Sequence, residues 1–132
     1  MELYTTLTCT AEGPIAAVLH DAFEGMSNGE LGAKLQDRLD PLGARVADKL
    51  AMLLDEDLLD LHVEDYARTG DRFELSIMTG GSGEDSVAAF MELLHLCGAT
   101  DIRARLEGDD YARLLWLENG TVMEEPIDLE NE

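Results

Sequence analysis

The chain has 132 residues, of which 45% are hydrophobic, a length and composition that fit one globular domain with its own core. Nine basic residues against 29 acidic ones give a formal net charge of −20. This charge argues against direct binding to nucleic acid or to an anionic membrane, and it favours basic protein surfaces as partners.

The sequence indicates a cytoplasmic protein. No apolar run approaches the ~20 residues that span a bilayer. The N-terminal segment has neither the basic flank nor the apolar stretch of a signal peptide. Cys9 and Cys97 are too few for a disulfide framework, so we expect two buried free thiols.

The first half of the chain predicts one strand and three helices. Residues 2–10 alternate apolar and polar side chains, as a strand does. Gly13-Pro14 then opens an amphipathic helix that Gly25 can close. Leucines at helical spacing over 30–54 predict two further helices, which we interpret as a helical pair inserted at 28–55.

The second half predicts two hairpins around a helix. Strands near 59–66 and 73–77 are joined by a turn at 68–71. The Gly-rich segment 80–83 leads to an amphipathic helix that Gly98 stops, and a strand follows at 102–107. Residues 111–118 and 121–125 form a hairpin across Asn119-Gly120, and 127–132 form an acidic tail.

This order predicts a single α+β domain over 1–126. Its pattern is that of a ferredoxin-like βαββαβ sandwich with the inserted helical pair and an added C-terminal β-hairpin. The fold supports many unrelated activities, so it says little about function. Opposite the helices we expect an open sheet face, covered by the C-terminal hairpin or by a partner. That face is predicted to carry Tyr4, Thr6, Thr8, His62, Glu64 and Tyr66.

The predicted topology gathers acidic residues at one end of the sheet, where the first strand begins. Arg68 and Arg72 fall at the opposite end. Asp55, Glu56 and Asp57 lie at a predicted helix C-terminus, where the helix dipole disfavours negative charge, so the dipole does not explain them and a binding role is favoured. The predicted partner-binding residues at the acidic end are Asp55, Glu56, Asp57, Asp60, Glu84, Asp85, Glu107, Asp109 and Asp110.

The motifs give no support for catalysis, a metal or a cofactor. Residues 80–83 have the strand–loop–helix context of a phosphate-binding loop, but they lack its lysine. A flexible turn in which Ser82 caps the following helix is favoured. The aspartates at 55, 57 and 60 do not match a calcium-binding EF-hand loop. The three histidines are isolated from one another and from the cysteines.

Two hypotheses from different classes follow. The first is an acidic inhibitor that occupies a basic surface, such as a nucleic-acid-binding groove or a nuclease, by charge mimicry, as an anti-restriction, anti-CRISPR or toxin-immunity protein would. The second is a small accessory or ligand-binding domain from a salt-adapted organism, in which the acidity serves solubility. An enzyme is a distant third.

Overall fold

The computed structural model describes residues 3–29, 33–56, 61–79, 83–108 and 112–127, and the statements below concern these ranges. The strands are β1 (Leu3–Thr10), β2 (Leu61–Thr69), β3 (Arg72–Thr79), β4 (Thr100–Glu107), β5 (Ala112–Glu118) and β6 (Thr121–Pro126). The helices are α1 (Gly13–Ser27), α2 (Ala33–Leu39), α3 (Ala44–Glu56) and α4 (Gly83–Cys97), with a 3-10 turn at Asp40–Leu42.

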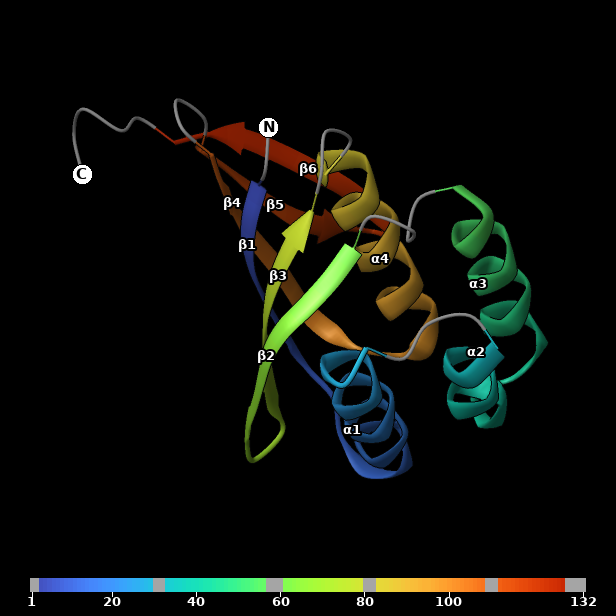
Figure 1. The fold of residues 1–132 in the computed structure, drawn as a ribbon. Coiled ribbons are helices and arrows are strands. Elements are labelled where there is room, and N and C mark those ends of the chain that lie inside the picture. Colours follow the sequence, from blue (N-terminus) through green and yellow to red (C-terminus); the bar gives the residue numbers. More distant parts are fainter. Residues whose placement is uncertain (1–2, 30–32, 57–60, 80–82, 109–111, 128–132) are drawn as a thin grey trace.

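The strands form one antiparallel sheet in the order β2-β3-β1-β4-β5-β6. An α+β fold is therefore confirmed. The C-terminal hairpin β5–β6 continues the sheet beyond β4 (Figure 1). The expectation that this hairpin covers the open face is wrong, because β5 pairs edge to edge with β4 along five residue pairs.

The core lies between one face of the sheet and helices α1 and α4 (Figure 1). Alternate side chains of β1, β3 and β4 point to that face, and Leu7, Leu75 and Leu106 on it are completely buried. Phe23 of α1 joins the layers: its ring lies 5.6 Å from Phe73 of the sheet and 6.3 Å from Phe90 of α4. Such edge-on ring pairs add to the free energy gained by burial.

The helical pair expected over 28–55 is present as α2 and α3. These helices pack against α1 and α4 on the side away from the sheet (Figure 1). Leu35 of α2 and Leu50 of α3 are fully buried. Lys49 of α3 also reaches Glu92 of α4, with 3.1 Å between Nζ and Oε2. The Leu-rich stripes of this segment are therefore core in the folded chain.

Tyr66 corrects the prediction for the open face. The register of β2 shifts between Val63 and Asp65, and such a bulge moves the following side chains to the other face. Tyr66 consequently packs against the core, with its ring 5.8 Å from Phe23. Its hydroxyl lies 2.7 Å from Nδ1 of His20 on α1. The prediction that Tyr66 shares the open face is wrong.

Glycines end both long core helices, although not always where expected. Helix α1 continues past Gly25 to Ser27, and Gly29 takes the left-handed conformation, at φ +87°. Helix α4 stops at Gly98 as predicted. There the amide of Gly98 donates to the carbonyl of His95 and the amide of Ala99 donates to that of Leu94, which is a Schellman motif.

The close approach of α4 to α1 at Gly98 gives a first prediction. A Cβ on Gly98, at φ +98°, would lie 2.7 Å from Cδ1 of Ile15, whereas one on Gly29 would meet nothing within 4 Å. Gly29→Ala should lower the free energy of unfolding by about 1 kcal/mol from backbone strain alone. Gly98→Ala should cost a further ~1–3 kcal/mol from overpacking, measured by urea unfolding. Equal losses in the two variants would show that Ile15 moves aside freely.

Candidate functional site

Acidic side chains gather at the end of the sheet where β1 begins. Strand pairing brings Tyr4 beside Glu107, and Leu114 beside Glu125, at this end. Helix α4 begins there directly after β3, whose Thr79 pairs with Leu3. We call the described carboxylates at this end the acidic rim: Glu84 and Asp85 on α4, Glu107 on β4, and Glu124 and Glu125 on β6.

Three of the nine predicted contact residues belong to this rim with described side chains, namely Glu84, Asp85 and Glu107. Asp55 and Glu56 are the last residues of α3, which ends on the same side of the molecule (Figure 1). Asp57, Asp60, Asp109 and Asp110 lie outside the described residues, as does the predicted helix cap Ser82. The role of all nine in binding stays a prediction.

A carboxyl pair with a shared arginine lies within the rim. Arg113 of β5 lies 2.6 Å from Oε1 of Glu124 and 3.8 Å from Oε1 of Glu84, each measured from Nη1. Burial and the neighbouring Glu124 raise the pKa of Glu84 from 4.5 to about 7. A hydrogen bond from Glu84, together with Arg113, lowers the pKa of Glu124. The arrangement therefore favours a protonated Glu84 that donates a hydrogen bond to the ionised Glu124.

The opposite end of the sheet carries more arginine. Asp101 forms ion pairs with two of these arginines. Its Oδ1 lies 2.9 Å from Nε of Arg103, and its Oδ2 lies 3.7 Å from Nη1 of Arg72. Arg68 places its guanidinium 5.1 Å from the centre of the Phe73 ring. The predicted position of Arg68 and Arg72, away from the rim, agrees with the hairpin turn between β2 and β3.

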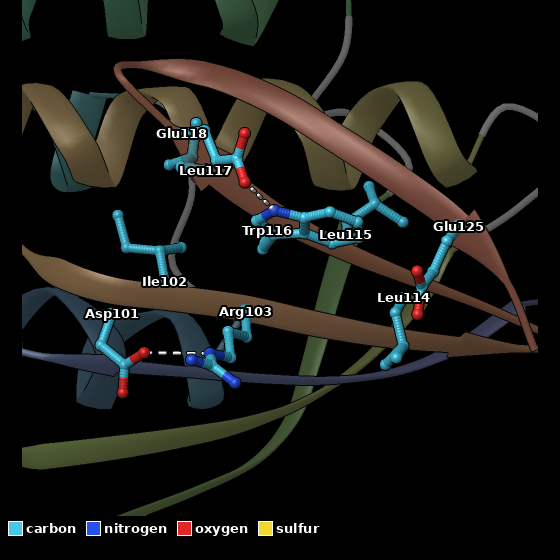
Figure 2. Close-up of a pocket in the computed structure, with 9 residues that line it drawn as sticks. All are labelled: Asp101, Ile102, Arg103, Leu114, Leu115, Trp116, Leu117, Glu118 and Glu125. Atoms are coloured by element: carbon cyan, nitrogen blue, oxygen red, sulfur yellow. Dashed lines mark hydrogen bonds and ion pairs between the residues drawn. The ribbon is translucent and has the colours of Figure 1, made fainter.

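A pocket of about 480 Å³ opens on the helix-free face, between β4 and the C-terminal hairpin (Figure 2). Leu114 and Trp116 of β5 form its apolar side, and they alternate with side chains that face the core. The indole N–H of Trp116 donates to Oε1 of Glu118 at 3.2 Å. The charged residues around this pocket, which we call the Trp116 pocket, are Asp101, Arg103, Glu118 and Glu125.

The sequence carries a signal for this pocket that the prediction of a plain C-terminal hairpin overlooks. In the stretch 112–118, ARLLWLE, apolar side chains occur on both faces of the strand. Only one face of β5 packs on the core, so Leu114 and Trp116 lie on the other. The ion network of Glu84, Arg113 and Glu124 has no comparable signal, because no pattern of residues sets the distance between α4 and β6.

The remaining reactive groups are dispersed or buried. Among the described residues, no group of three or more histidines, cysteines or acids is arranged to hold a metal ion. Cys9 and Cys97 are buried, and burial raises the pKa of each thiol to about 12.

No described helix is both long and apolar enough to cross a membrane. Comparison with protein-family models, with curated proteins and with solved structures found no match.

The carboxyl pair predicts an unusual pH dependence of stability. Because the pKa of Glu84 is raised on folding, the proton it holds stabilises the folded state fully below about pH 4.5, and this contribution is lost as the pH rises through 7. Glu84→Gln keeps a hydrogen-bond donor for Glu124 and cannot ionise. The variant should match the wild type near pH 4.5 and exceed it in unfolding free energy at pH 8.

Urea unfolding between pH 4.5 and 8 measures this difference. Asp85→Asn is the matched control, since it removes one exposed charge from the same helix turn and leaves both carboxyls of the pair in place; the charge of Asp85 is the smallest of the contributions that raise the pKa of Glu84. Parallel pH profiles for Glu84→Gln and the wild type would show that Glu84 titrates as an ordinary carboxylate.

Proposed function

We propose that this chain is a non-catalytic acidic binding protein that inhibits a basic partner by charge mimicry. The partner is a nucleic-acid-binding protein or nuclease, and the activity is of the anti-restriction, anti-CRISPR or toxin-immunity type. The observation that carries the proposal is the acidic rim, in which the start of α4 and the ends of β4 and β6 bring five carboxyl groups to one end of a protein with a net charge of −20.

The attachment of the rim to regular elements supports mimicry. Surfaces that bind nucleic acid use Lys and Arg to neutralise phosphates. Carboxylates can occupy such a surface well only if little entropy is lost in ordering them. In the rim, Glu107 is tied to Arg105 and Glu124 to Arg113, so these two carboxylates are already oriented. The predicted contacts Asp55, Glu56, Asp57, Asp60, Asp109 and Asp110 belong to the same proposal.

Neutralising the rim tests this function. The triple variant Asp85→Asn, Glu107→Gln, Glu124→Gln removes three charges and keeps oxygen acceptors for Arg105 and Arg113. The partner is first captured on the immobilised protein from a cell lysate at low salt and displaced with duplex DNA. We expect the triple variant to bind that partner at least about tenfold more weakly, mostly through slower association.

The control variant removes the same charge from exposed positions away from the rim: Glu12→Gln, Asp48→Asn, Asp71→Asn. Its overall charge equals that of the rim variant, and it should keep most of the affinity because the three positions lie away from the rim. If both triples lose affinity equally, total charge governs association and the rim is not the site. An unchanged affinity in the rim variant would remove these carboxylates from the interface.

The competing explanation, acidity for solubility in strong salt, makes a different prediction. Only two of the nine basic residues are Lys, a composition that also suits a salt-adapted protein. A mimic of nucleic acid that works on cytoplasmic enzymes should fold near physiological ionic strength, with a Tm that rises only modestly with potassium chloride as self-repulsion is screened. A requirement for molar salt, measured by thermal melting, would favour the solubility explanation.

A finer assignment of the fold belongs with this proposal. The pattern of β1, α1, β2, β3, α4 and β4 supports a ferredoxin-like core, because β1 lies between β3 and β4 and both helices cover the same face. In this assignment α2 and α3 are the inserted pair and β5–β6 the added hairpin. Strands β5 and β6 make the sheet wider than that of a simple ferredoxin-like protein.

A further inference from the structure

We propose that the Trp116 pocket receives one arginine or lysine side chain of the basic partner. The inference rests on the proposed function and adds to it a specific point of contact. It makes the helix-free face of β4, β5 and β6 part of the docking surface, together with the acidic rim.

The pocket is continuous with the rim. Glu125 belongs to both, because it lines the pocket and pairs with Leu114 at the rim end of β5. Asp101 and Glu118 lie toward the other end of the same strands. Figure 2 shows Glu125 at one end of the pocket, so an extended basic segment that contacts the rim can pass Glu125 and reach the pocket.

The charges around the pocket favour a cation. Its lining has three carboxylates against the single guanidinium of Arg103. Arg103 is itself held by Asp101 at 2.9 Å, so its charge is offset within the lining. The side chain of Glu125 makes no hydrogen bond or ion pair with any other described residue, which leaves its carboxylate available to a ligand. An anionic ligand would meet this excess of negative charge.

The apolar side of the pocket selects a long side chain over a simple cation. Leu114 and Trp116 are half-buried and offer a surface for the methylene stem of Arg or Lys. The face of an indole also attracts a cation lying within about 6 Å of its centre. The methylene stem of one basic side chain can therefore pack on Leu114 and Trp116 while its charged group lies near the carboxylates of the pocket. The volume, about 480 Å³, falls within the range of pockets that enclose ligands.

Two other hollows along the same sheet fit less well. The one at the centre of the helix-free face, beside Tyr4 and Arg105, is about 210 Å³, and Arg105 there is bound to Glu107. The one between His95 and the Asn119–Gly120 turn is about 390 Å³, and Asp101 is its single carboxylate.

Trp116 is the only tryptophan in the chain, so its fluorescence reports on this pocket alone. The probe is an acetylated, amidated peptide of six Arg-Gly repeats, titrated into the full chain at low ionic strength. We expect a saturable change in Trp116 emission. Leu114→Ala, which alters no charge, should weaken peptide binding about three- to tenfold. Glu125→Gln should do the same, whereas Glu74→Gln, on the same face but outside the pocket, should change it less than twofold.

The outcomes separate this inference from the proposed function. If the peptide binds by calorimetry while Trp116 emission and the affinity of Leu114→Ala stay unchanged, the pocket is not used and the rim remains the site. If spermine saturates the emission change at lower concentration than the peptide, the occupant is a small polycation and the inference is overturned. If the peptide does not bind at all, both proposals fail. Circular dichroism of each variant checks that it is folded.

Discussion

The packing of α1 and α4 against a single face of the sheet holds the molecule together. Strict alternation in β1, β3 and β4 places their large apolar side chains on that face, and each buried Leu or Phe contributes roughly 1.5–3 kcal/mol. Phe23 contacts both the sheet and α4, so the two helices and the sheet are fixed together. The opposite face is left without helices, and there Tyr4 is 55% and Met123 39% exposed.

This core must also oppose the self-repulsion of a strongly acidic chain. Several arginines lower that repulsion locally: Arg103 lies beside Asp101, Arg105 beside Glu107 and Arg113 beside Glu124. Exposed pairs of this kind contribute little individually, about 0–1 kcal/mol. Their larger effect here is on orientation, because they hold carboxylates at the strand ends in defined positions. The same ion pairs therefore reduce repulsion, and two of them fix the positions of Glu107 and Glu124 at the acidic end of the molecule.

The sequence predicted the elements well and their side-chain environments less well. Asn119-Gly120 specified its hairpin because both residues adopt positive φ, at +53° and +81°, as a two-residue turn requires. The face of the sheet on which Tyr66 lies was not predictable. The bulge between Val63 and Asp65 reverses that face, but it leaves the strand-like composition of the segment unchanged. The acidic end followed from connectivity alone. The Trp116 pocket did not, because it depends on the hairpin extending the sheet instead of folding over it.

The two cysteines of the folded protein react slowly with thiol reagents because both are buried. Burial raises the pKa of each thiol to about 12, so almost none of either is ionised at pH 8, and only the thiolate attacks alkylating reagents or disulfides. Cys9 on β1 and Cys97 at the end of α4 are therefore shielded from such reagents for as long as the sheet and its helices stay together. Modification of either thiol therefore requires the core to open. The rate at which a thiol reagent modifies the folded protein reports how often it opens spontaneously.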